Sequence, residues 1–234
     1  MTLSFIGWLN GVTASGVFIF SIFFGLFAVY KARKTHLKLL LYLGLVYIFA
    51  GLIYTGDFLD FLTILITQTN IDNSSGIIGF INWIWFPGVT LFAMYFGAEL
   101  IIPSKKWLIF SIYLVLGVIF ELFIIFDPIG SISYYYPSIP GEDLINDSIE
   151  GLVPSILTLA FLLSMLLLDG IGFLIKSIQS TGEIRRKFLL LSIGAFMYII
   201  GGILDGLFSP GITLIFIRAA MALSAVLFYL GVKQ

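Results

Sequence analysis

Seven long apolar runs, separated by short polar segments, constrain the fold of this chain more than any motif does. A bilayer core needs about 20 apolar residues for each helix that crosses it, and runs of that length recur along the sequence. Apolar residues make up 60% of the 234 positions and charged residues only 11%, a balance that cannot solvate a soluble globule. We therefore predict an all-α membrane protein, a single seven-transmembrane-helix bundle over residues 1–234, with spans at about 12–30, 39–61, 78–102, 107–126, 152–175, 188–207 and 212–232.

The basic residues predict how the bundle is oriented. All but one of the 12 Lys and Arg residues fall in the first, third and fifth connections or in the C-terminal tail. The second, fourth and sixth connections carry neither Lys nor Arg, and the second and fourth carry acidic residues. Because short cytoplasmic loops retain positive charge, we expect the N-terminus outside and the C-terminus inside. The chain is thus predicted to be a multi-pass protein of the cell membrane, surrounded by membrane lipid, with no nucleic-acid partner.

Arg218 is the one basic residue inside an apolar run. At a helical rise of about 1.5 Å per residue it lies about 10 Å inside the seventh span, and buried charges of this kind usually face a partner within the bundle. The same count places Asp57 and Asp205 near the level of Arg218, with Glu121 somewhat deeper. We therefore predict a polar cluster of these four residues in the outer half of the bundle.

Two interpretations of this cluster remain open. In the first, Arg218 forms a structural ion pair, most simply with Asp205 on the adjacent helix. In the second, the permanently charged guanidinium, which can bond two oxygens at once, receives an anionic small-molecule ligand from an outward-open pocket.

Other acidic residues are expected to have different surroundings. Glu99 is close in sequence to the lysines of the third connection and is expected to pair with them. Asp169 lies about 10 Å inside the membrane by the same count and therefore needs an internal partner. Asp60 lies near the outer water boundary, where we expect it to be solvated.

The longest connection, residues 127–151, contains three consecutive tyrosines, Tyr134, Tyr135 and Tyr136, together with two prolines. Loops longer than about 15 residues are usually either functional or disordered. The tyrosines fit an ordered lid over the mouth of the bundle, and they equally fit an aromatic loop at the membrane interface.

Several function classes lack the residues that they require. The chain has no cysteine, and its single histidine, His36, lies in a connection, so no span can build a metal site or a Ser–His hydrolase from these residues. A rhodopsin-type retinal protein needs a lysine in the middle of the seventh span, and Lys233 is terminal. Asp57 and Asp205 could imitate an aspartyl protease pair, but Arg218 would hold both ionised. We expect no enzyme activity, no cofactor and no metal.

Three short segments resemble the seven-helix membrane sensor region found in many prokaryotic histidine kinases. They are residues 96–99 (Phe-Gly-Ala-Glu) followed by Trp107, residues 127–128 (Asp-Pro), and residues 176–187, which lead into a glycine-containing sixth span. The resemblance covers most of the chain from about residue 39, although Arg218 departs from that family's pattern. It implies an outer-facing sensory module that passes a conformational signal inward. Because residues up to Gln234 contain no phosphoacceptor or ATP-binding domain, the output is expected to pass through a cytoplasmic signalling partner.

The leading functional expectation is a stand-alone seven-helix receptor or sensor with an outer pocket around Arg218. A small secondary transporter is the main alternative, because it would use paired intramembrane acids and the Pro87-Gly88 pair within a span. A structural or lipid-binding membrane subunit is the third, and it would need Arg218 only as an internal ion pair.

Overall fold

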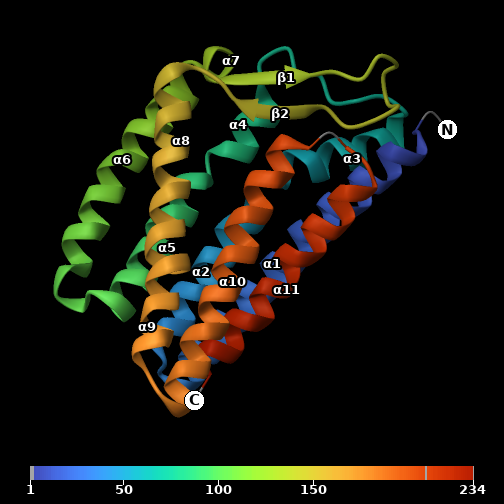
Figure 1. Cartoon of the computed structure of the whole chain (residues 1–234). Coiled ribbons are helices and arrows are strands. Elements are labelled where there is room, and N and C mark those ends of the chain that lie inside the picture. The colour runs from blue at the N-terminus through green and yellow to red at the C-terminus, as the bar shows by residue number, and fades with distance from the viewer. Residues whose placement is uncertain (1–2, 209, 234) are drawn as a thin grey trace.

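The computed structural model describes residues 3–208 and 210–233, which form a helical bundle with a short two-stranded sheet at one end (Figure 1). The elements are α1 (Phe5–Thr35), α2 (Lys38–Leu52), α3 (Thr55–Thr67), α4 (Ile77–Trp83), α5 (Phe86–Ile101), the 3₁₀-helix η1 (Pro103–Lys105), α6 (Lys106–Phe126), α7 (Pro128–Ser131), β1 (Ile132–Tyr135), β2 (Asn146–Ile149), α8 (Leu152–Met165), the π-helical segment η2 (Leu166–Gly172), α9 (Phe173–Gln179), α10 (Gly182–Leu207) and α11 (Ile212–Val232).

The described helices confirm a multi-pass helical membrane protein. Six helical units are long and apolar enough to cross a bilayer: α1, α4 with α5, η1 with α6, α8 to α9, α10 and α11. The bent pair α2–α3 makes a seventh if the two helices are counted as one span. Large apolar side chains cover the outside of the bundle, including Phe23 at 69% exposure and Val115 at 59%, as expected where lipid replaces water.

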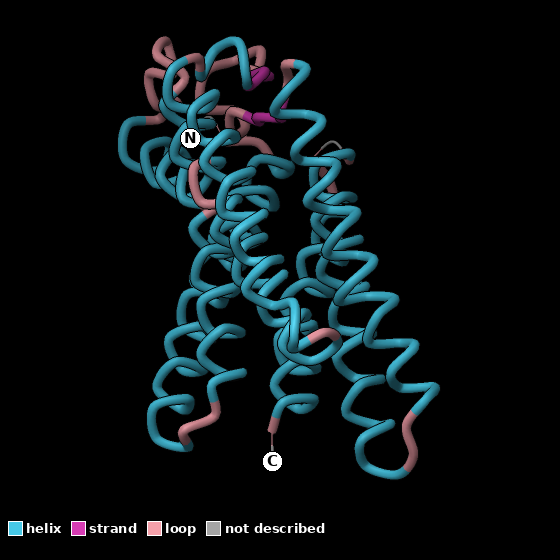
Figure 2. The backbone as a smooth tube through the Cα atoms, turned by 90° about the vertical axis from the view of Figure 1, so that its left-hand side faces the viewer, coloured by secondary structure: helices cyan, strands magenta, loops and turns pink. Residues whose placement is uncertain are grey.

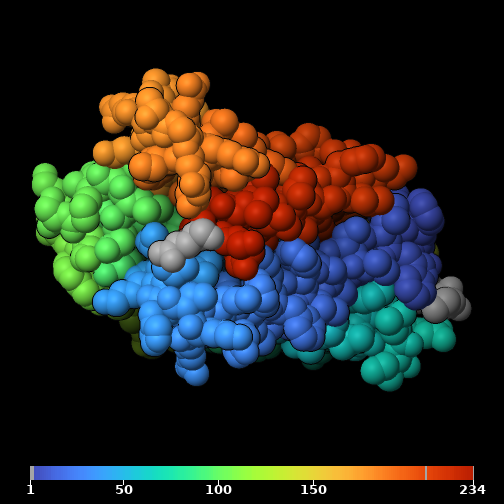
Figure 3. All heavy atoms as spheres, turned by 90° about the horizontal axis from the view of Figure 1, so that it is seen from below, coloured from blue at the N-terminus to red at the C-terminus, as the bar shows by residue number. Residues whose placement is uncertain are grey.

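The two ends of the bundle differ in what they carry. The start of α1 and the β1–β2 hairpin lie at one end, which we call the hairpin end (Figures 1 and 2). The turns α1–α2, α5–α6 and α9–α10 lie with the C-terminus at the opposite end, which we call the basic end because most of the Lys and Arg residues lie in or next to those turns. Seen from the basic end, the molecule is elongated, with α6 at one extreme and α1 and α3 towards the other (Figure 3).

The second predicted span is not a continuous helix, because it bends by 42° between α2 and α3. At the bend, the Gly56 N–H donates to the side-chain oxygen of Asn82 at 2.6 Å. The Leu52 carbonyl, which would accept that N–H in an unbroken helix, instead accepts from the Thr55 hydroxyl at 2.6 Å. Two side chains therefore satisfy the backbone groups that the break sets free, as a membrane interior requires.

The third predicted span is also interrupted, between α4 and α5. Pro87 lies in the first turn of α5, and its missing N–H leaves the Trp83 carbonyl without a helical donor. The fifth span contains the π-helical segment η2, where the Ser192 hydroxyl of α10 donates to the Gly170 carbonyl at 2.8 Å. Three spans predicted as regular helices are thus locally irregular.

The hairpin end carries strands that the apolar pattern did not predict. β1 and β2 pair antiparallel, with Tyr134 opposite Asp147. The segment between the strands reaches the start of α1, where the Ser4 N–H donates to the Glu142 carbonyl at 2.9 Å. The residues of this connection therefore form an ordered cap across the end of the bundle (Figure 1).

Asp60 holds this cap together, and the expectation that it is solvated is wrong. Its side chain is 0% exposed. One carboxylate oxygen accepts from the Ile71 N–H at 2.8 Å, and the other accepts from the Asn70 amide and the Ile145 N–H, both at 2.9 Å. Burial of the carboxylate is tolerated because these three donors replace the water that would otherwise solvate it. The same hydrogen bonds join α3 to two separate loops.

Close helix packing depends on glycine where backbones meet. A Cβ atom added at Gly25 of α1 would lie 2.7 Å from the Gly44 carbonyl of α2, and one added at Gly44 would lie 2.7 Å from the Gly25 carbonyl. Only the absence of side chains allows this approach. The largest core cluster fills the middle of the bundle around Tyr47, Phe96 and Phe173.

Candidate functional site

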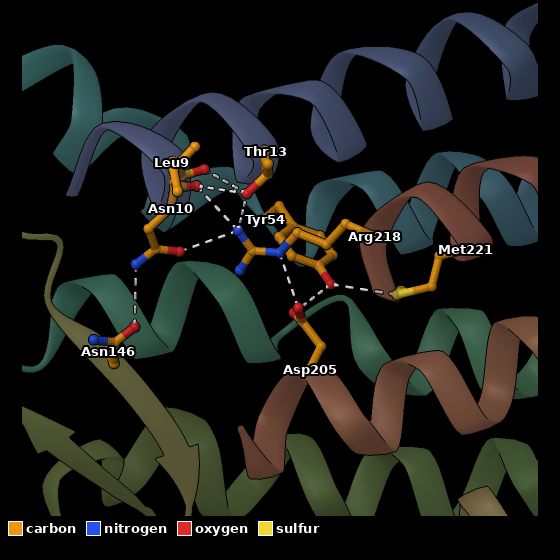
Figure 4. Close-up of polar contacts among 8 residues, drawn as sticks. All are labelled: Leu9, Asn10, Thr13, Tyr54, Asn146, Asp205, Arg218 and Met221. Atoms are coloured by element: carbon orange, nitrogen blue, oxygen red, sulfur yellow. Dashed lines mark hydrogen bonds and ion pairs between the residues drawn. The ribbon is translucent and has the colours of Figure 1, made fainter. Parts of the chain in front are cut away.

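Arg218 lies inside the bundle and forms the predicted ion pair with Asp205. It is 6% exposed, and its Nε donates to Asp205 Oδ1 at 2.9 Å (Figure 4). The Tyr54 hydroxyl donates to the second oxygen of Asp205 at 2.7 Å, and the Tyr54 ring lies 5.6 Å from the guanidinium carbon. Both carboxylate oxygens of Asp205 are therefore occupied, and the cation also has an aromatic face against it.

The same guanidinium ties the last helix to the first. Its Nη1 donates to the Asn10 carbonyl and side-chain oxygen, both at 3.0 Å, and to the Thr13 hydroxyl at 2.7 Å. Figure 4 shows Arg218 reaching between α1 and Asp205 of α10. Because the protein already supplies acceptors to Nε and Nη1, Nη2 alone has no hydrogen-bond partner among the described residues, which leaves little capacity for an anion.

A cavity of about 180 Å³ lies beside this ion pair, in the half of the bundle nearest the hairpin. Both interrupted spans border it, through Ile53 and Tyr54 at one break and Trp83 and Phe86 at the other. Its wall is mainly apolar. The remaining lining residues are Ala50, Asp57, Asn82, Val89, Asn146, Asp147, Thr158, Leu162, Met165, Tyr198, Ile199, Gly202, Asp205, Gly206, Arg218 and Met221.

Two carboxylates in the cavity wall share one amide. The Asn82 amide donates to Asp57 Oδ1 at 3.1 Å and approaches the two oxygens of Asp147 at 3.4 and 3.5 Å. Asn82 is 2% exposed, and its own oxygen is held by the Gly56 N–H. The bend between α2 and α3 thus fixes the amide that links both acids, and Asp147 comes from strand β2 of the cap.

Burial raises the pKa of Asp147, which lies on β2, to about 6, and the hydrogen bond from Asn82 opposes that rise. Burial also raises the pKa of the cap residue Asp143, whereas hydrogen bonds from Ser74 lower the pKa of the exposed Asp72. The cavity carboxylate supplied by the hairpin therefore has a pKa well above that of an ordinary aspartate.

Of the four residues in the predicted cluster, three line one cavity and the fourth does not. Arg218, Asp205 and Asp57 all contribute to its wall. Glu121 lies on α6, is not among the lining residues, and has no hydrogen bond or ion pair within the described chain. Placing it in the cluster was wrong, because matching depth does not fix which way a helix face points.

The two predicted inner acids have different surroundings. Glu99 pairs with Lys106 at 2.7 Å, as expected. Asp169 is 4% exposed on η2, but its Oδ1 has no hydrogen-bond partner within residues 3–208 and 210–233. The expected internal partner is therefore not found there, because Asp169 packs against the backbone of Gly97 and the nearby Ser192 hydroxyl is used by the Gly170 carbonyl.

The three tyrosines do not face the cavity. The Tyr134 hydroxyl donates to the Gly76 carbonyl at 2.9 Å, Tyr136 accepts from the Asn73 amide at 3.2 Å, and Tyr135 is 71% exposed. The cavity wall instead receives Asn146 and Asp147 from the same hairpin. If the hairpin acts as a lid, the strand that contributes to the site is β2.

Sequence reasoning missed Asn82, Asp147 and Asn10. Their only signal was polarity close to the ends of apolar runs, and an uncharged amide gives a weaker signal than a charge inside a run. Asn82 in particular lies within a predicted span and connects a helix break to both acids.

Comparisons with known proteins do not indicate what this site binds. No family model, no curated protein and no solved structure matches the chain. Function is therefore inferred from the geometry of the residues themselves.

Proposed function

We propose that this protein is a seven-span receptor or sensor of the cell membrane that binds a small molecule in the cavity at the hairpin end. The observation that carries the proposal is the cavity itself, which gathers buried and half-buried polar groups from α3, α4, α10, α11 and β2 into a mostly apolar wall. Pockets of this composition are the usual places for small ligands. In this proposal the hairpin end faces outward and the basic end faces the cytoplasm.

The cavity is coupled to the opposite end through α11. Arg218 connects the cavity wall to α1 and α10, and α11 then continues to the basic end. A ligand that shifts the Arg218 contacts would therefore bias the position of a helix that reaches the proposed cytoplasmic partner. The resemblance to histidine-kinase sensor regions points the same way, as an analogy.

A carrier is the second candidate, and one observation favours it. Both interruptions, between α2 and α3 and between α4 and α5, lie at the cavity, and discontinuous helices commonly form the substrate sites of secondary transporters. A structural or lipid-binding subunit would need no occupied cavity at all.

The test measures binding, movement and flux on one preparation. The protein is reconstituted in nanodiscs and its unfolding temperature is measured with benzylammonium, benzyl alcohol or benzoate. Because the chain has no cysteine, Thr35→Cys with Lys233→Cys gives two selective spin labels at the basic end, one at the end of α1 and one at the end of α11. The sensor proposal expects a change in the label distance with a binding compound and no uptake of that compound into liposomes.

Each other result decides against the sensor. Uptake that requires the protein would replace it with the carrier. Binding without movement or uptake, or no binding by any compound, would leave a structural role.

A further inference from the structure

Once Arg218 is neutralised by Asp205, the charge left in the cavity is acidic. Asp57 and Asp147 both line the wall, and neither forms an ion pair with a basic residue in the described part of the chain. Their one shared partner is the Asn82 amide, which donates hydrogen bonds but carries no charge. The cavity therefore presents an uncompensated pair of carboxylates to whatever enters it.

Two carboxylates held by the same amide repel each other strongly where the surroundings are apolar. The arrangement is relieved either by a proton held between the acids or by a cation bound to them. A built cavity next to the pair makes the second solution available, and the occupied guanidinium gives an anion little to bind.

The rest of the wall indicates which kind of cation fits. Four aromatic side chains line the cavity: Tyr54, Trp83, Phe86 and Tyr198. Aromatic faces attract organic ammonium groups and pack against their hydrocarbon parts. Calcium, by contrast, takes six to eight oxygen ligands, and no group of three or more acidic or histidine side chains suited to a metal occurs within residues 3–208 and 210–233.

Size limits the ligand further. An apolar protein cavity of about 150 Å³ is known to hold benzene. The present volume of about 180 Å³ therefore admits one ring, or a branched chain of similar bulk, with a single amino group. The Thr158 hydroxyl, which is buried in the wall and has no partner among the described residues, offers one additional polar contact.

We propose that the cavity binds a small organic ammonium ion, whose charged nitrogen lies between Asp57 and Asp147 and whose apolar part packs against the aromatic wall. This inference rests on the proposed function, since it names the ligand class of the same cavity. It differs from the expected anionic ligand because it assigns Arg218 to structure and the two acids to recognition.

The first test varies only the charge of the ligand. Benzylammonium, benzyl alcohol and benzoate share one ring, and their apparent dissociation constants follow from the unfolding temperature of the intact protein in phosphatidylglycerol nanodiscs. Benzylammonium is expected to bind at least tenfold more tightly than the other two, since hydrogen bonds to charged groups are worth that factor or more. Equal binding, or tighter binding of benzoate, would overturn the ammonium assignment and keep the cavity as a binding site. No binding by any of them would also remove the proposed function.

A second test uses wild-type protein and needs no variant to fold. Benzylammonium stays protonated between pH 5 and 7.5, whereas Asp147 gains a proton over that range. The affinity of the protein for benzylammonium should therefore fall about tenfold when the pH is lowered from 7.5 to 5, whereas benzyl alcohol should bind equally well at both pH values. A pH-independent benzylammonium affinity would exclude Asp147 as its partner.

Two variants then locate the site. Asp147→Asn and Asp57→Asn should each weaken benzylammonium binding at least tenfold, whereas Asp72→Asn, an exposed acid of the neighbouring loop, should leave it unchanged. Equal losses in all three would show that benzylammonium responds only to surface charge, and no loss in the first two would place it elsewhere.

The same ammonium chemistry occurs in free amines and in lipid headgroups. Nanodiscs that contain phosphatidylethanolamine distinguish a lipid headgroup from a free amine as the natural occupant of the cavity. If the headgroup is the occupant, benzylammonium binding should weaken relative to phosphatidylglycerol alone. If a free amine is the occupant, the two lipids should give the same affinity. Calcium chloride serves as the metal control, and a larger stabilisation by calcium than by benzylammonium would overturn the organic assignment.

Discussion

At the scale of single residues, the strength of the Arg218–Asp205 pair lies in how completely both partners are satisfied. Guanidinium and carboxylate are buried together, and the Tyr54 hydroxyl donates a hydrogen bond to the second carboxylate oxygen. Such a pair is weak evidence for net stabilisation, because desolvation of two charges offsets their attraction, yet removing one partner leaves an uncompensated charge in the bundle.

We predict that Arg218→Leu lowers the free energy of unfolding by about 3–5 kcal/mol, and that adding Asp205→Leu restores most of the loss. The physical reason is that the double variant removes both charges, whereas the single variant strands Asp205. Urea or thermal unfolding in the same nanodiscs gives the values for the double-mutant cycle. Equal losses in the single and double variants would contradict the predicted coupling.

Asp147 provides a second prediction at this scale, on stability without ligand. Its pKa is raised to about 6 in the folded protein, so the folded state holds a proton more tightly than the unfolded state does. Stability is therefore greatest below the ordinary carboxyl pKa of about 4 and falls as pH rises through 6. We expect the unfolding temperature to drop between pH 4.5 and 7, and this drop to become smaller in Asp147→Asn. A drop of unchanged size in that variant would assign it to other groups.

At the scale of elements, helix contacts through glycine set how closely α1 and α2 can pack. Gly25 and Gly16 lie in the same helix, but a Cβ atom at Gly25 meets the α2 backbone and one at Gly16 meets nothing within 4 Å. We predict that Gly25→Ala destabilises the protein by about 1–3 kcal/mol, because backbone atoms must move apart. Gly16→Ala should be neutral or stabilise by up to about 1 kcal/mol through its higher helix propensity. Similar unfolding temperatures for the two variants would show that α1 and α2 separate easily.

The helices were predictable from the sequence, but their interruptions were largely not. Each of the seven apolar runs is helical over most of its length, because a membrane interior leaves the backbone few alternatives. The bends were hidden, since Asn82 and Thr55 replace helical hydrogen bonds from positions that look ordinary in a hydropathy pattern. Pro87 gave a visible warning of the second break. Depth counting brought Arg218, Asp57 and Asp205 to one cavity, but it failed for Glu121, since depth along a helix says nothing of its rotation.

At the scale of the whole molecule, the bent pair α2–α3 decides the topology. If it crosses the membrane, Thr35 in the first connection and Ser138 in the hairpin lie on opposite sides. If it does not, only α4–α5 and α6 separate them, and they lie on the same side. We predict opposite sides: in intact cells an impermeant maleimide should label Ser138→Cys but not Thr35→Cys, and permeabilised cells should label both.

Ser104→Cys calibrates this experiment, because only one helix long enough to cross the membrane, α6, separates it from the hairpin. It should behave as Thr35→Cys does. Labelling of Thr35→Cys together with Ser138→Cys, while Ser104→Cys stays protected, would reduce the count to six crossings.

The contact of Arg218 with α1 has a consequence for biosynthesis. Asn10 and Thr13 enter the membrane with α1, the first helix of the described chain, and their guanidinium partner arrives with α11, the last one. Until α11 is inserted, α1 lacks this packing partner and the Asp205 carboxylate has no ion-pair partner. Ribosome-stalled chains that end before residue 212 should therefore be recognised as unfinished by membrane quality control, whereas chains that expose the whole of α11 should escape degradation.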